Sequence, residues 1–203
     1  MGGNKIILLP SYLLPGKAYF KLIRDSELVL INDIEKYQKQ SPRNHFEILT
    51  SQGPIKITFP VQKPGDQTVM NEILIDRNQK WIRNHWKSIQ TAYGKAPFFE
   101  FYFELFENEF RNPPDRLLEL NNKLLLVCMK ILKLKSPLKL ISDVQNEDFL
   151  KEELADVKID EEIIFNKPDE LAYRQHFGNE FVPSMSIIDL IFNHGPESTR
   201  YLH

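Results

Sequence analysis

The sequence has almost no cysteine: Cys128 is the only one in 203 residues. A single cysteine cannot form a disulfide within the chain, and a protein of this size without disulfides is typical of a reducing compartment. Cys128 also lies in the apolar run 124–129, where a thiolate would lose its hydration. We therefore expect a cytoplasmic protein in which Cys128 fills the core.

Long hydrophobic runs are also missing. No segment reaches the roughly 18 apolar residues of a membrane helix. Residues 1–10 lack the basic stretch and apolar run of a secretory signal. The sequence predicts no membrane insertion.

Positive charge is not in excess, since 26 Lys and Arg face 28 Asp and Glu for a net charge of −2. A surface that neutralises many nucleic-acid phosphates is therefore not expected. Nine of the acids fall between residues 143 and 162 against two bases there, which leaves the remainder mildly basic. Such a body is compatible with a small anionic ligand such as a nucleotide or sugar phosphate, but the charge pattern favours the plainer interpretation of a solvated acidic segment on a neutral protein.

The common catalytic signatures are absent. The sequence holds no G-x-x-x-x-G-K-[ST] phosphate loop, no G-x-G-x-x-G fingerprint and no G-x-S-x-G elbow. Its five histidines never pair at ligand spacing with another His or with Cys128, so we predict no metal site. No cofactor follows from the sequence.

What is present predicts an α/β fold in one domain spanning residues 1–203, because 42% of the residues are hydrophobic and no linker interrupts the chain. Apolar runs at 5–9 and 27–31 flank helical spacing at 16–25, a β-α-β unit with parallel strands. Alternation over 46–59 predicts a hairpin. A further strand at 72–76 would make the sheet mixed.

The middle of the chain reads as helical. We expect helices beginning near Trp81, with Asp76 or Asn78 as cap, and over 98–110 and 114–134. A strand at 138–142 and an exposed amphipathic helix in the acidic segment follow. The last helix spans 187–193, capped by Ser184 or Ser186.

The loop at residues 33–45 is the first candidate binding segment. It follows a predicted parallel strand and concentrates Lys39, Arg43 and Asn44 within a few residues. Arginine binds phosphate or carboxylate with two parallel hydrogen bonds, and such loops at the carboxyl ends of strands often bind ligands. A plain solvent-exposed connection would contain the same residues.

The turn after the first strand is the second candidate. The helix that follows would point its amides at the sheet edge where α/β proteins bind anions, with Tyr12 and Lys17 beside them. Alternatively, Tyr12 packs in the core and Lys17 is solvated.

Two histidines are candidates for proton transfer. His85 faces the apolar side of its helix, four residues after Trp81, so a hydrogen-bonded core histidine competes with a general base. His176 lies in a less regular region, in Tyr173-Arg-Gln-His-Phe-Gly178.

Short motifs follow one another in a specific order along nearly the whole chain. They include Tyr12-Leu-Leu-Pro15, Tyr37-Gln-Lys-Gln-Ser-Pro-Arg-Asn44, Thr58-Phe-Pro-Val61, Trp81-Ile-Arg-Asn-His85, His176-Phe-Gly178 and the ending Phe181-Val-Pro-Ser-Met-Ser-Ile-Ile-Asp-Leu-Ile-Phe-Asn-His-Gly-Pro-Glu197. In this order they resemble the WbqC-like family of bacterial proteins. That family is associated with gene clusters for O-antigen and other surface polysaccharides, so the resemblance implies this context. Many relatives place His-Gln-Pro after the first strand, where this chain has Leu8-Leu-Pro10. If relatives use that His as a catalytic acid, this chain would use His85 or His176 in its place, or be inactive.

Two hypotheses follow. In the first, the protein is a cytosolic transferase or sugar-modifying protein that acts on a nucleotide-linked or other anionic metabolite. Lys39, Arg43 and Asn44 hold the anion, and His85 or His176 moves a proton. In the second, it is a non-catalytic interaction or scaffold protein of the same pathway, which docks a partner through the aromatic helix at 98–110 or the acidic helix.

Overall fold

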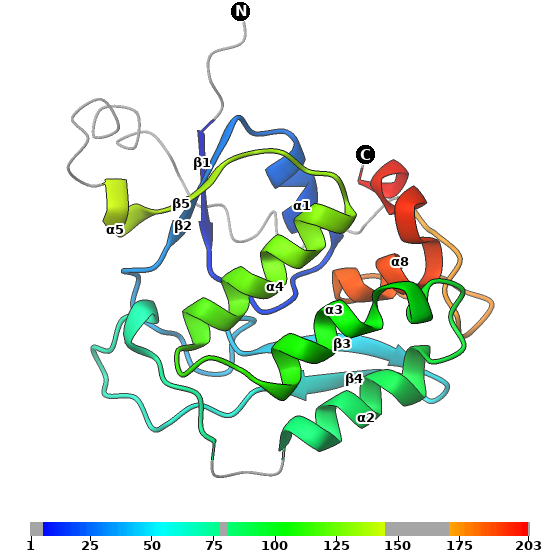
Figure 1. Cartoon of the computed structure of the whole chain (residues 1–203), viewed down its shortest axis with the longest axis horizontal. Helices are drawn as coiled ribbons and strands as arrows, with labels where there is room; N and C mark the ends of the chain where they lie inside the picture. Colours follow the sequence, from blue (N-terminus) through cyan, green and yellow to red (C-terminus); the bar gives the residue numbers. More distant parts are fainter. Residues whose placement is uncertain (1–5, 78–80, 145–170, 203) are drawn as a thin grey trace, which may run out of the picture.

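A computed structural model describes residues 6–77, 81–144 and 171–202. The fold is α/β, as predicted (Figure 1). Three parallel strands form one sheet in the order β1-β2-β5. Their bounds are Ile6–Pro10 for β1, Leu28–Asn32 for β2 and Leu138–Leu140 for β5.

Helix α1 (Lys17–Arg24) connects β1 to β2, which confirms the predicted β-α-β unit. The register pairs Ile6 with Leu28 and Pro10 with Asn32. Because the two strands are parallel, the turn that follows β1 and the loop that follows β2 leave the sheet at the same edge. This topology brings both candidate binding segments to one side of the molecule.

The predicted hairpin consists of β3 (His45–Thr50) and β4 (Gly53–Thr58), which pair antiparallel as a second, separate sheet. The strand expected at 72–76 is not formed. A 3₁₀ helix, η1 (Met70–Glu72), stands there, followed by two isolated bridges. Ile75 pairs with Val61 while its neighbour Leu74 pairs with Arg116, so the backbone bonds go to two different partners and no ladder develops.

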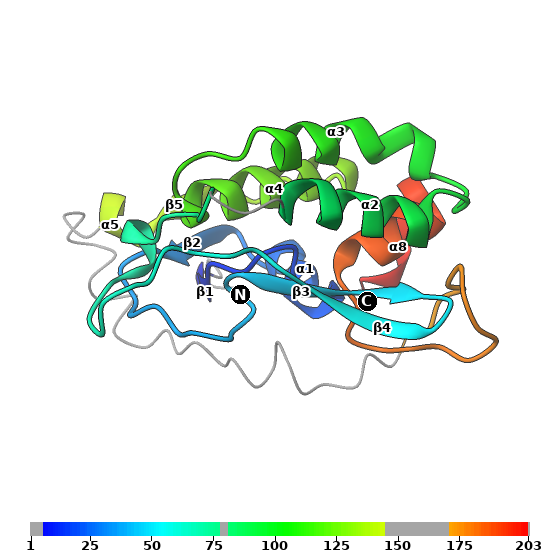
Figure 2. The same ribbon diagram turned by 90° about the horizontal axis from the view of Figure 1, so that it is seen from below.

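The three middle helices cover the strands as one layer (Figure 2). They are α2 (Trp81–Tyr93), α3 (Phe99–Arg111) and α4 (Leu117–Ile131). Phe110 of α3 packs its ring 5.2 Å from Phe59 and 6.4 Å from Phe46, centroid to centroid, which joins this layer to the hairpin. None of the described helices is long and apolar enough to cross a membrane.

The chain ends in α8 (Ile187–His194) and the 3₁₀ helix η2 (Gly195–Tyr201), after the short helix α5 (Ile141–Val144) earlier in the chain. Ser186 caps α8, since its side chain accepts a hydrogen bond from the amide of Ile188. The alternative cap, Ser184, does not take this role. The predicted acidic helix, apart from its first residues, and the cap Asn78 lie outside the described residues.

Gly195 directly follows α8 and packs against Phe98 at the start of α3. Its φ is +51°, and a β-carbon placed on it would lie 2.3 Å from Cδ1 of Phe98. The amide of Phe98 also donates to the carbonyl of Phe192 at 2.9 Å. Only glycine satisfies both the backbone conformation and the close approach.

Gly195→Ala should lower the free energy of unfolding by at least about 2 kcal/mol, because it adds steric overlap to an unfavourable backbone conformation. Urea denaturation followed by tryptophan fluorescence measures the change. Gly178→Ala is the matched control. Gly178 also has a positive φ, of +81°, but a β-carbon placed on it would lie 3.6 Å from the carbonyl oxygen of Glu180, an ordinary contact. Equal losses in the two variants would show that the contact with Phe98 has no effect.

Candidate functional site

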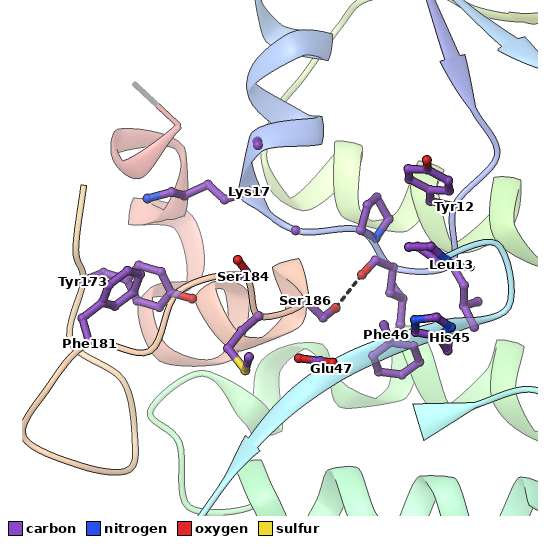
Figure 3. Close-up of a pocket in the computed structure, with 16 residues that line it drawn as sticks. Tyr12, Leu13, Lys17, His45, Phe46, Glu47, Tyr173, Phe181, Ser184 and Ser186 are labelled. Carbon is purple, nitrogen blue, oxygen red and sulfur yellow. Dashed lines mark hydrogen bonds between the residues drawn. The ribbon is translucent and has the colours of Figure 1, made fainter. Parts of the chain in front are cut away.

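A cavity of about 230 Å³ lies where the β1–α1 turn, the start of β3 and the segment before α8 meet (Figure 3). The polar residues in its wall are Tyr12, Lys17, His45, Glu47, Tyr173, Ser184 and Ser186. Lys17 and Tyr173 lie toward one end, and Tyr12 and His45 lie toward the other. The cavity is therefore built from segments at both ends of the sequence.

Helix α1 begins at this cavity. Gly16 is its N-cap residue and has no side chain to cap the first turn. The close packing requires glycine here, because a β-carbon on Gly16 would lie 3.0 Å from the carbonyl oxygen of Met185. A helix N-terminus carries a partial positive charge, which favours an anion in the cavity.

Lys17 adds a full positive charge at the same place. Its side chain is 7% exposed, and its ammonium donates a 2.6 Å hydrogen bond to the carbonyl of Leu171. The ammonium also lies 5.5 Å from the centroid of the Tyr173 ring. These contacts hold the charge against the wall that Tyr173 forms.

Two residues of the wall adopt the left-handed backbone conformation without being glycine. Leu14 has a φ of +43° and Ser184 a φ of +64°. Each costs on the order of 1 kcal/mol, which tertiary contacts must offset. One such contact is the hydrogen bond of 2.8 Å that the Ser186 hydroxyl donates to the carbonyl of Leu14 (Figure 3). Strain of this kind concentrates at binding sites.

Asp189 does not line the cavity, but it binds and positions Tyr173 in the cavity wall. Its carboxylate, fully buried, accepts hydrogen bonds from the Tyr93 hydroxyl at 2.9 Å, the Tyr173 hydroxyl at 2.7 Å and the Gln175 amide at 2.9 Å. Burial raises the pKa of Asp189 above its usual value, although the three donors favour the charged form. Burial and the adjacent carboxylate raise the pKa of Tyr173.

His45 is the histidine in the cavity wall. Burial, reinforced by the charge of Lys56, lowers the pKa of the His45 imidazole, and Glu47 opposes this only in part. The imidazole is therefore neutral at neutral pH and able to accept a proton. Sequence patterns gave no reason to single it out, because most of the residues that share the cavity wall with His45 are remote from it in the sequence.

The structure brings three of the predicted site residues together. The Arg43 guanidinium lies 5.5 Å from the centroid of the Tyr12 ring, and Asn44 follows it in the chain. Arg43 is fully buried and forms two parallel hydrogen bonds to Glu35, at 2.9 and 2.7 Å. The Asn44 amide donates to the carbonyl of Phe59 at 2.9 Å. Arg43 and Asn44 thus make structural contacts, while Tyr12 also lines the cavity.

The other three predicted residues lie apart from this group. Lys39 is exposed in the turn between β2 and β3. His85 packs with its ring centroid 5.4 Å from those of both Phe59 and Trp81, and burial lowers its pKa. His176 lines an open groove beside the end of α8. Within the described ranges, no three His, Cys, Asp or Glu side chains are grouped so that they could hold a metal ion.

The sequence profile of the WbqC-like protein family matches residues 10–162 and, with some overlap, 149–201. The chain belongs to the WbqC-like protein family. The resemblance read from the order of the motifs is thereby confirmed. The chain is also 30% identical to "Uncharacterized protein Rv1507c" of Mycobacterium tuberculosis over 98% of its own length and 97% of that protein. No solved structure matches it.

The buried pair of Arg43 and Glu35 should be strongly coupled. Arg43→Met leaves a carboxylate that is 13% exposed without its main partner, and the expected loss is about 3 kcal/mol. Glu35→Gln weakens the same contact, so the double variant should lose less than the two single losses combined. Urea denaturation of all four proteins measures this coupling. The exposed pair Arg24 and Asp25 serves as control and should show less than about 1 kcal/mol; equal coupling in both pairs would contradict the structural role of Arg43.

The raised pKa of Asp189 sets a pH dependence of stability. The folded protein holds this proton more tightly than the unfolded chain, so its stabilising effect is complete below the ordinary carboxyl pKa of about 3.9 and is lost as pH rises through the raised value. Asp189→Asn is neutral throughout. Relative to this variant, the wild type should become less stable as pH rises from about 3.9 through the raised pKa of Asp189. Denaturation at each pH measures the difference, and Glu104→Gln, at an exposed position of α3, is the control. A difference that does not change with pH would refute this assignment.

Proposed function

We propose that the protein is a transferase or sugar-modifying protein that binds an anionic metabolite, such as a nucleotide-linked sugar, in the cavity at the start of α1. The observation that carries this proposal is that Lys17 and the N-terminus of α1 line one cavity. Both contribute positive charge, and the partly buried setting makes their attraction for an anion stronger than it would be in water.

The size of the cavity limits what it can hold. At about 230 Å³ it is smaller than the 300–1,000 Å³ of sites that enclose a whole drug-sized ligand. We infer that it takes one end of a metabolite, such as a phosphate or carboxylate with the atoms next to it. Tyr12 and Phe46 provide apolar wall at the opposite end from Lys17 (Figure 3).

The proposal assigns roles that differ from those expected from the sequence. Lys17 lines the cavity and Arg43 does not, so Lys17 takes the place of Arg43 as the group that holds the anion. His45, whose pKa is lowered, is the group in the cavity that can accept a proton from a nucleophilic hydroxyl. Tyr12 keeps its predicted place in the binding site.

The biological setting of the proposal comes from the family. The WbqC-like family is associated with O-antigen and other surface-polysaccharide gene clusters, and we propose that this protein acts in that biosynthesis in the cytoplasm. An anionic sugar metabolite fits both that setting and the charge of the cavity.

A panel of nucleotides, nucleotide sugars and sugar phosphates, screened by thermal shift, tests the proposal. At least one compound should raise the Tm of the wild type, and Lys17→Gln should bind it about tenfold more weakly or worse, since a charged hydrogen bond is lost. Lys21→Gln is the matched control, because Lys21 lies one helical turn further along α1 and is exposed. A panel without any shift, or equal binding by the two lysine variants, would rule out this site.

A second candidate function is a docking protein of the same pathway. Phe99, Phe106 and Phe110 of α3 are buried in the core, but Phe101 is 74% exposed and Leu105 is 42% exposed on the same helix. These two side chains favour a small contact surface on α3.

A further inference from the structure

A second concave feature lies beside the cavity and shares none of its lining residues. It is an open groove of about 880 Å³ between the α2–α3 connection, the carboxyl end of α8 and the segment 174–179. The charged and polar residues in its wall are Lys95, Arg174, Gln175, His176, Asn179, Asn193 and His194. We call this feature the basic groove.

The lining of the basic groove is one-sided in charge. Lys95 and Arg174 are permanently positive, and two imidazoles lie beside them. The remaining polar groups are amides, and none of the described residues in the wall is Asp or Glu. A cleft lined by one sign of charge concentrates ions of the opposite sign.

The segment 173–176 separates the groove from the cavity, because Tyr173 lines the cavity and the residues after it line the groove. Along residues 173–176, successive side chains alternate between contact with Asp189 and a more exposed position at the groove. Tyr173 and Gln175 are buried and donate to the same oxygen of Asp189, at 2.7 and 2.9 Å. Arg174 lies between these two residues in the sequence and His176 follows them. Both are more exposed and line the groove. The Asp189 contacts therefore hold the segment so that Arg174 and His176 line the groove.

The opposite wall is fixed as well. Nε2 of His194 lies 2.9 Å from the carbonyl oxygen of Arg174, which ties the end of α8 to the segment. The hydrogen bond from Phe98 to Phe192 and the close packing of Phe98 on Gly195 hold the α2–α3 connection, which carries Lys95, against α8. The basic groups are thus carried on three fixed pieces of chain, and the ordering that remains when a ligand binds is that of the exposed Lys95 and Arg174 side chains.

We propose that the basic groove is a second binding site, which takes the phosphate group of a phosphorylated small molecule. The planar guanidinium of Arg174 can bind two phosphate oxygens side by side, and Lys95 supplies a point charge from the other wall. The amide of Asn179 can donate to a further oxygen, and Asn193, whose Nδ2 already donates to the carbonyl of Asp189 at 2.7 Å, has one hydrogen left to donate. The volume is large enough for a ligand of nucleotide size, unlike the cavity at α1.

A third concavity shows what distinguishes the basic groove. It is lined by Arg83, Lys87 and Arg111, but Arg111 forms a 2.7 Å ion pair with Glu107, and Ile82 and Trp86 contribute apolar surface. Its positive charge is comparable, so it provides a control for charge alone.

Inorganic pyrophosphate, titrated into the full chain by calorimetry at constant ionic strength, tests the proposal. We expect one equivalent to bind the wild type and the double variant Lys95→Gln, Arg174→Gln to bind at least about tenfold more weakly, since two charged hydrogen bonds are lost. The double variant Arg83→Gln, Lys87→Gln removes the same charge at the third concavity and should bind like the wild type. In NMR spectra, the imidazole signals of His176 and His194 should shift on titration while that of His85 does not.

The outcomes separate this proposal from the function proposed for the cavity. If Lys17→Gln weakens pyrophosphate binding and the groove variant does not, the phosphate binds at α1 and the second site is disproved. If both double variants weaken binding equally, or the wild type does not bind, the groove attracts ions only by general charge and the proposal fails. Binding that depends on Lys95 and Arg174 but not on Lys17 supports the groove, whatever the panel of metabolites shows for the cavity.

Discussion

The buried carboxylate of Asp189 is the contact on which both concave sites depend. It binds Tyr93 from the helical layer together with Tyr173 and Gln175 from the segment before α8. The Tyr93 hydroxyl also accepts a hydrogen bond from the backbone amide of Leu49, so the network reaches β3. A buried charge is tolerated only when several donors surround it, and here those donors are the side chains that position the walls. Binding geometry and fold stability therefore share one set of hydrogen bonds.

Most of the fold could be predicted because its signals are local. Apolar runs, alternation and helical spacing each identify an element from neighbouring residues, and β1, α1, β2, the hairpin and the middle helices were found in this way. The strand expected at 72–76 was wrong for a non-local reason. Ile73 and Ile75 are buried as a strand would bury them, but their backbone groups bond to Leu117 and Asp115. The backbone groups of Leu74 and Asp76 bond instead to Gln62 and Pro60 on the hairpin side, and no periodicity reveals this division.

The site was harder to predict than the fold. Topology placed Tyr12 and Lys17 correctly at the edge of the sheet, because parallel strands fix where a β-α turn must lie. Arg43 looked like an anion-binding group because its residue type suits that role. Its buried bond to Glu35 depends on how the loop folds back over eight residues. Asp189 carried a usable signal, an acid within the apolar helix Ile187–His194, but its partners Tyr93 and Tyr173 are remote in sequence.

The contact between the β1–α1 turn and the start of α8 has a consequence for biosynthesis of the protein. Ser186 donates to the carbonyl of Leu14 across 172 positions of sequence, and the amide of Ile187 donates to the carbonyl of Pro15. Contacts of such separation form late, because a long loop must close first. During translation the N-terminal turn emerges long before its partner. The nascent chain therefore has no complete cavity until Ser186 and the start of α8 have left the ribosome and can reach the β1–α1 turn.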